Sequence, residues 1–160
     1  MGRGGFKMNY TKSAYRLETK RIKEPDFPYH AQAALNSPEN VVAFVRALQE
    51  SDIEKMIILH LNTQHKLICI QIQTGTIDKA VIYPREIIKH SLLSGGASIV
   101  IVHNHPGENP EPSLEDHGLT KKIFEACNTL DIHLLDHIII GDNSSFVSFA
   151  TLYLLPQKST

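Results

Sequence analysis

The 160-residue chain is long enough to bury one substantial core and too short for two full-sized domains. Its composition, 42% hydrophobic and 21% charged, excludes an intrinsically disordered chain, and a net charge of −1 gives no overall attraction toward nucleic acid. The sequence has two cysteines and no apolar run or start typical of a membrane span or signal peptide, which predicts a reduced, cytoplasmic protein without disulfides or membrane contact.

Positive charge is concentrated at the start of the chain. Residues 1–24 carry a balance of +5 and the remainder a balance of −6. We assign residues 1–36 to a basic arm with a proline-containing linker, and residues 37–160 to one folded domain. A basic arm can contact phosphate groups, although most such leaders are simply solvated, so nucleic acid is one hypothesis for its partner.

The domain is predicted to begin with a helix and a hairpin. Ser37, Pro38 and Glu39 supply an N-cap, a proline at the first helical position and an acid in the first turn of a helix reaching residue 50. Strands are predicted at 54–61 and 66–73, on either side of a turn, with a short strand at 80–83. A helix at 85–93 ends at Gly95.

The second half alternates strands and helices. A buried strand at 99–102 is followed by a helix at 113–128, strands at 132–140 and 145–149, and a short helical cap at 152–155. Cys69 and Cys127 are expected to be small core residues. This order predicts an α/β (α+β) fold, a mixed β-sheet flanked by helices.

Two histidines stand at the end of the buried strand. His103 and His105 are two residues apart, so on a strand they share one face, roughly 7 Å apart along the chain. Two imidazoles on one face can converge on one metal ion, and Pro106 then ends the strand. Asp116 can supply a third ligand, which leaves the fourth position open, as a catalytic zinc requires.

Each part of this pattern also has an ordinary explanation. Ser113 and Asp116 fit the N-cap and the third position of any helix. A His-x-His pair at the end of a strand is more often a surface or core pair than a metal site. The combination favours the metal, because the strand, the loop and the cap bring the three side chains toward one point.

The spacing from His103-x-His105-Pro106 through Ser113 to Asp116 resembles the JAMM (JAB/MPN) metalloprotease motif. The segments 84–86 and 135–137 are similar to the bacterial RadC branch of that family, and the resemblance covers roughly residues 54–149. Asn104 departs from eukaryotic members, which tend to have Ser there, and it touches no presumed ligand. The resemblance implies a JAB/MPN fold similar to cytidine deaminases.

The resemblance also implies roles for residues. His103, His105 and Asp116 would be the ligands of a Zn²⁺ ion. The family's general base is a glutamate on the first hairpin strand, which by position is Glu54, with Glu86 as its rival. Ser113 would donate a hydrogen bond to the oxyanion.

The neighbouring pair Asp136 and His137 leaves two interpretations open. Either residue can orient a metal ligand from behind, or the two can form a hydrogen-bonded structural pair.

Three functions remain open on the sequence. The first, implied by the resemblance, is a zinc metallohydrolase that cleaves peptide or isopeptide bonds in a peptide or protein substrate. The second is a non-catalytic MPN-type binding or scaffold module, although here every motif position is filled. The third is a DNA-repair-associated role, for which the basic arm is the only sequence support.

Overall fold

The computed structural model describes residues 35–45, 53–74, 83–106, 109–142 and 145–157. Its elements are α1 (Pro38–Phe44), β1 (Lys55–Leu61), β2 (Leu67–Thr74), α2 (Pro84–Ser94), β3 (Ser98–Asn104), α3 (Leu114–Thr129), β4 (His133–Ile140) and β5 (Phe146–Ser148). The predicted basic arm lies outside the described residues except for its last two, and so do residues 46–50 of the first predicted helix and 80–82 of the short predicted strand.

The strands form one mixed sheet in the order β2-β1-β3-β4-β5. β1 pairs antiparallel with β2 and β3, β4 pairs antiparallel with β5, and β3 and β4 run parallel. Parallel neighbours need a long connection, and α3 supplies it. The predicted α/β fold with a mixed sheet is confirmed.

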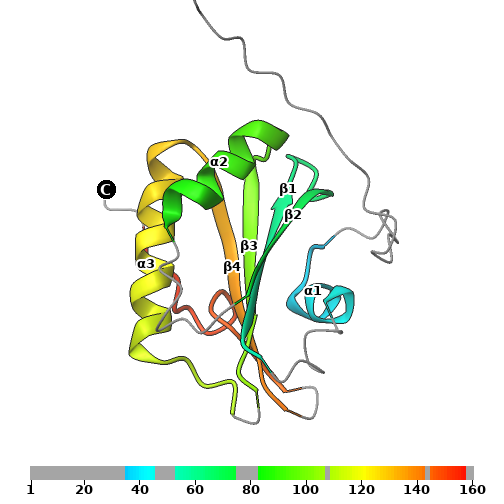
Figure 1. The fold of residues 1–160 in the computed structure, drawn as a ribbon, viewed down its shortest axis with the longest axis vertical. Helices are drawn as coiled ribbons and strands as arrows, with labels where there is room; N and C mark the ends of the chain where they lie inside the picture. The colour runs from blue at the N-terminus through cyan, green and yellow to red at the C-terminus, as the bar shows by residue number, and fades with distance from the viewer. Residues whose placement is uncertain (1–34, 46–52, 75–82, 107–108, 143–144, 158–160) are drawn as a thin grey trace, which may run out of the picture.

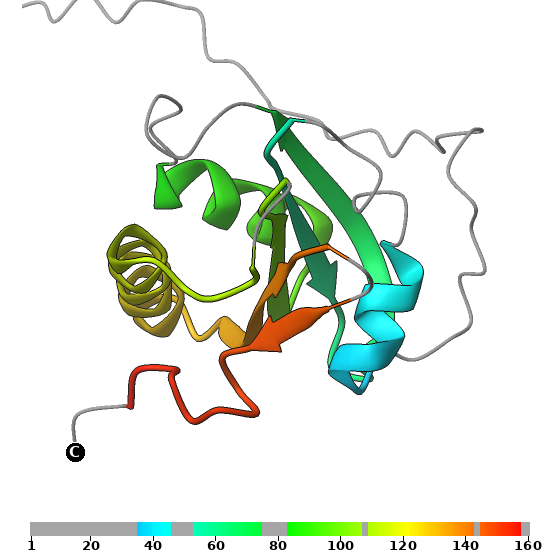
Figure 2. The ribbon, with the colours of Figure 1, turned by 90° about the horizontal axis from the view of Figure 1, so that it is seen from below.

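Helices cover both faces of the sheet (Figure 1, Figure 2): α2 and α3 lie on one face and α1 on the other. Side chains alternate between the two faces along each strand. The α1 face buries a cluster made of Leu35, Val41, Val45, Ile57, Leu59, Leu61, Val100, Val102, Ile138 and Ile140.

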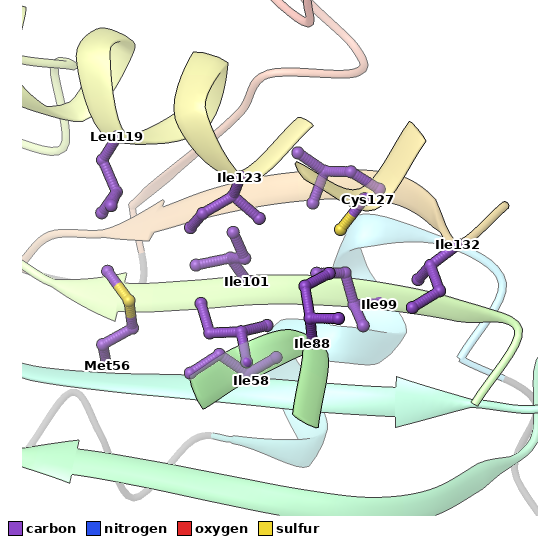
Figure 3. Close-up of a cluster of buried hydrophobic side chains, with 11 residues drawn as sticks. Met56, Ile58, Ile88, Ile99, Ile101, Leu119, Ile123, Cys127 and Ile132 are labelled. Carbon is purple, nitrogen blue, oxygen red and sulfur yellow. The ribbon is translucent and has the colours of Figure 1, made fainter. Parts of the chain in front are cut away.

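A second cluster fills the space between the sheet and helices α2 and α3 (Figure 3). Leu119, Ile123 and Cys127 point from α3 toward the sheet, because spacings of four residues keep them on one helix face. Burial raises the pKa of the Cys127 thiol to about 12, so this cysteine is a protonated core residue, as predicted. Each fully buried aliphatic side chain contributes roughly 1.5–3 kcal/mol, and this layer holds α3 in place over β3.

Local signals explain where the helices begin and end. Ser37 caps α1 by accepting from Asn40 N–H at 3.3 Å. Gly95 ends α2 with a φ of 76°, a left-handed conformation that favours glycine.

The chain after β5 differs from the prediction. Residues 149–153 form turns and no helix is present at 152–155. Tyr153 has a φ of 57°, which is incompatible with a continuing right-handed helix. Within the described part of the chain, no helix combines the length and apolar character needed to cross a membrane.

Candidate metal centre

The candidate site lies at one end of the central strands of the sheet, where β3 ends and where β1 and α3 begin (Figure 1). The antiparallel register places Met56 opposite His103, which brings the start of β1, and with it Glu54, next to the histidines. His105 follows β3, and its backbone N–H donates to Ile140 O at 2.8 Å. The end of β4 therefore holds the second histidine in place.

Four predicted side chains converge there. His103 Nε2 lies 3.0 Å from His105 Nε2 and 3.1 Å from Asp116 Oδ1, and His105 Nε2 lies 3.5 Å from Asp116 Oδ2. One possible ligand atom from each of Glu54, His103 and His105 lies within 4.8 Å of the others. Donors about 2.0–2.1 Å from a tetrahedral zinc ion stand roughly 3.3 Å apart, so the spacing fits zinc.

Asp116 is fully buried and carries an unsatisfied oxygen. Ser113 donates its backbone N–H to Asp116 Oδ2 at 2.8 Å and its hydroxyl at 2.6 Å. From the described part of the chain, Oδ1 receives no hydrogen bond, although it lies beside His103. Burial acts to raise the pKa of the Asp116 carboxyl, but His103 and His105, when they carry a proton on Nε2, and the Ser113 hydrogen bonds hold it well below its usual range. A buried, ionised oxygen without a donor is costly unless a cation satisfies it.

A chain of hydrogen bonds runs behind His103, which is itself fully buried. His103 Nδ1 lies 2.8 Å from His137 Nε2, and His137 Nδ1 lies 2.6 Å from Thr120 Oγ1. Thr120 donates its one hydroxyl proton to the Asp116 carbonyl oxygen at 2.7 Å. Its oxygen can therefore only accept from His137, so the proton of His137 is on Nδ1.

This chain fixes the tautomer of His103. Burial lowers the pKa of His137 well below its ordinary value, and its ring stacks on Phe149 at 4.8 Å between centroids, so His137 is neutral. Its Nε2 then accepts from the Nδ1–H of His103. The Nε2 of His103 is left as a bare lone pair facing Asp116, which is the tautomer that a metal requires.

His105 is oriented in the same way. Its Nδ1–H donates to the Asn109 carbonyl oxygen at 3.4 Å, which leaves Nε2 toward Asp116. When His105 is protonated, its Nε2–H can donate to Asp116, which raises the pKa of His105; burial opposes this, and the charge of Glu54 adds to the rise. The two carboxylates therefore make this point favourable for positive charge.

Ser113 caps α3, as predicted. Its Oγ accepts from Asp116 N–H at 3.1 Å, and the two residues form a reciprocal capping box. Its hydroxyl proton points at Asp116 Oδ2, so donation to an oxyanion requires this exposed hydroxyl to rotate. That role stays a prediction.

Asp136 and His137 have separate roles. Asp136 Oδ1 accepts from the N–H groups of His137 and Ala150 at 2.8 and 2.9 Å, and Oδ2 accepts the Ser148 hydroxyl at 2.6 Å. Burial raises the pKa of Asp136, and these hydrogen bonds oppose the rise. Asp136 thus ties β4 to β5 and the turn after it, while His137 reaches a candidate ligand.

The two candidate bases lie in different surroundings. Glu86 stands at the start of α2, with its carboxylate 3.2 Å from Lys89 Nζ and 3.6 Å from Arg85 Nε. Glu54 lies with the histidines. The geometry favours Glu54.

The sequence analysis gave Thr120 no role in the site and missed the contacts of Asn104. Thr120 lies four residues after Asp116 on a predicted helix, hence on the same face, which was a usable signal. The Asn104 amide accepts from Lys55 N–H at 2.8 Å and donates to Ile53 O at 3.2 Å. These contacts depend on strand register, which the sequence did not specify.

Comparison with known proteins identifies the family. A family model described as a RadC-like JAB domain matches residues 35–154. The chain belongs to the RadC-like JAB domain family. UPF0758 protein XAC3915 of Xanthomonas axonopodis pv. citri (strain 306) is 41% identical over 119 residues, which are 73% of this chain and 52% of the relative. UPF0758 protein VFMJ11_0123 of Aliivibrio fischeri (strain MJ11) is 42% identical over 119 residues, 73% of this chain and 53% of the relative.

The RadC-like JAB match confirms the resemblance read from the motif. The chain spans about half the length of the curated relatives it matches. The matched segment contains every predicted site residue, namely Glu54, His103, His105, Ser113 and Asp116.

Proposed function

We propose that this RadC-like JAB domain is a zinc-dependent hydrolase that cleaves amide bonds in a peptide or protein substrate. One observation carries the proposal: two imidazole Nε2 atoms and an unsatisfied buried carboxylate oxygen converge, and a metal cation can satisfy all three. His103, His105 and Asp116 would hold the ion. When bound, zinc supplies a Lewis acid for a carbonyl oxygen and lowers the pKa of water.

The remaining residues supply proton transfer and orientation. Glu54, half-buried beside the histidines, takes the proton of the attacking water and passes it to the leaving amine. Ser113 holds Asp116 and, after rotation of its hydroxyl, donates to the oxyanion of the substrate. We also propose a reducing, cytoplasmic setting, which is supported by the thiol state of the two described cysteines, Cys69 and Cys127.

The test is metal content by mass spectrometry, on protein purified without chelator or nickel. We expect about one zinc per chain, lost in His105→Ala. His117→Ala is the matched control, because His117 follows Asp116 in sequence but packs on Phe149 at 5.1 Å between ring centroids. A peptide-library digest then follows, in which Glu54→Gln keeps zinc and loses cleavage. A parent chain that neither contains nor takes up zinc would support the scaffold alternative.

Nucleic-acid contact stays a prediction, since the basic arm lies outside the described residues. Deleting residues 1–24 should abolish retention on DNA if the arm makes this contact. An intact chain that is not retained at modest salt would contradict it.

A further inference from the structure

The side chain of Asn104 bridges the two backbone positions that flank Glu54. Its Oδ1 accepts from Lys55 N–H at 2.8 Å, and its Nδ2 donates to Ile53 O at 3.2 Å. Asn104 is 2% exposed, so both hydrogen bonds form away from bulk water, where a lost partner is costly. The residue between the two histidines is therefore tied to the chain on both sides of the candidate base.

This bridge stands where the backbone ladder stops. The last backbone pair between β1 and β3 is Met56 with His103, and continuing the register would place Lys55 opposite Asn104. A carboxamide carries a donor and an acceptor in one plane, as a peptide group does. The Asn104 amide thus extends the pairing past the end of the ladder and fixes the path of residues 53–55.

We propose that Asn104 is a positioning residue that sets the place of the Glu54 carboxylate relative to the metal ligands, an inference that rests on the proposed function. A general base must stand within hydrogen-bond reach of the proton it takes, and a displacement of about 1 Å can cost roughly 100-fold in rate. Glu54 precedes β1, and the bridge across its two neighbours restrains its backbone against β3. A serine here has a shorter reach, and its one oxygen would have to make both hydrogen bonds.

The competing explanation is that Asn104 only stabilises a strand end. Asn62 does this at the opposite end of β1, where its Oδ1 accepts from Gln64 N–H at 2.9 Å and Lys66 N–H at 3.0 Å. Asn62 therefore provides a matched control, a strand-end asparagine with two backbone hydrogen bonds and no candidate base beside it.

The experiment measures binding of acetohydroxamic acid to the zinc-loaded chain by calorimetry. This small chelator occupies open positions on zinc and offers a proton to a nearby carboxylate, so its affinity reports where Glu54 stands without any known substrate. The variants are Asn104→Leu, which keeps the branched shape and the number of side-chain heavy atoms and removes the amide, Glu54→Gln, the double variant, and Asn62→Leu. Zinc affinity and thermal unfolding are measured for each.

We expect Asn104→Leu to bind zinc as the parent does and to bind acetohydroxamic acid roughly tenfold more weakly. Because Asn104 acts through Glu54, the double variant should be no weaker than Glu54→Gln alone, and Asn62→Leu should match the parent. Parent-like binding in Asn104→Leu, or losses that add in the double variant, would overturn the inference. A parent without zinc, or a Glu54→Gln variant that binds the chelator normally, would instead overturn the proposed function.

A measurement on the parent chain covers the case in which Asn104→Leu does not fold. By NMR, the Lys55 amide should exchange with solvent as slowly as the amides in the centre of β1. Fast exchange at Lys55 would mean that the bridge is not maintained in solution and would overturn the inference.

Discussion

Two groups of histidines lie on the same face of the sheet, and only one is arranged to hold a metal ion. His103 and His105 meet Asp116 and Glu54 at the edge of the sheet. The second group is His60, on β1, with His90, on α2. His60 is fully buried, and its Nδ1 lies 2.7 Å from Ser91 Oγ. Its Nε2 has no hydrogen-bond partner among the described residues.

The surroundings of the two groups shift the pKa of a histidine in opposite directions. Burial and the nearby His90 lower the pKa of His60 to about 4. The Gln71 side chain acts to raise this pKa but offsets the lowering only in part. Asp116 raises the pKa of His105 despite its partial burial. A buried histidine is thus insufficient for a metal site. The accompanying carboxylates separate the two groups, since the Nε2 of His60 is also without a hydrogen-bond partner among the described residues.

The largest expected effect is on zinc-dependent stability. With free zinc at about a thousandfold above Kd, binding to the folded chain adds about 4 kcal/mol and raises Tm by about 10 °C. His60→Leu should keep this shift, because among the described residues His60 belongs to no cluster that could hold a metal ion. Asp116→Asn should lose most of it. Scanning calorimetry with and without zinc measures both, and a normal zinc shift in Asp116→Asn would remove Asp116 from the ligand set.

The second effect is on pH dependence at His60. Its folded pKa of about 4 lies below the unfolded value of about 6.5, so the unfolded chain binds the proton first as the pH falls. The contribution of the neutral, buried His60 to the free energy of unfolding is fully present above about pH 6.5 and is lost as the pH falls toward 4. When the pH falls from 7 to 5, the free energy of unfolding of the parent should decrease by about 2 kcal/mol more than that of His60→Leu. Urea unfolding at both pH values measures this, and parallel pH profiles would contradict it.

Much of the fold could be predicted because its signals are local. The apolar run and glycine and proline positions predicted β1 and α2 to within one residue at each end. The predicted helical cap after β5 was wrong, because the leucine pattern gives no sign that Tyr153 adopts a left-handed conformation. His103, His105 and Asp116 could be predicted as candidate ligands because their spacing along the chain already implies convergence. Glu54 came from family resemblance, since it lies far away in sequence.

The supporting hydrogen bonds could not be predicted, because they depend on register and packing. His137 reaches His103 only because β4 pairs in parallel with His137 opposite Ile101, after a register shift between Ile99 and Val100. Thr120 contributes only because the packing of α3 sets its rotation over that pair. A motif specifies which residue types are present, and the register decides which nitrogen carries the proton.

The smallest effect tests this hydrogen-bond chain directly. Thr120→Val keeps the side-chain shape and removes the oxygen that accepts from His137 Nδ1–H. His137 can then carry its proton on Nε2, which turns His103 to the tautomer with Nε2–H, and zinc affinity should fall roughly tenfold. Nitrogen-15 NMR should show His103 protonated on Nδ1 in the metal-free parent and a mixture in the variant.

The control for that measurement lies on the same helix. Thr129 donates its hydroxyl to the carbonyl oxygen four residues earlier, Glu125 O, at 3.0 Å, as Thr120 does to Asp116. Thr129→Val removes the same local bond and touches no histidine, so its zinc affinity should equal that of the parent. If both variants bind zinc equally well and His103 keeps its proton on Nδ1 in each, packing against the sheet alone orients the ring. The difference between the two groups of histidines would then rest on the carboxylates.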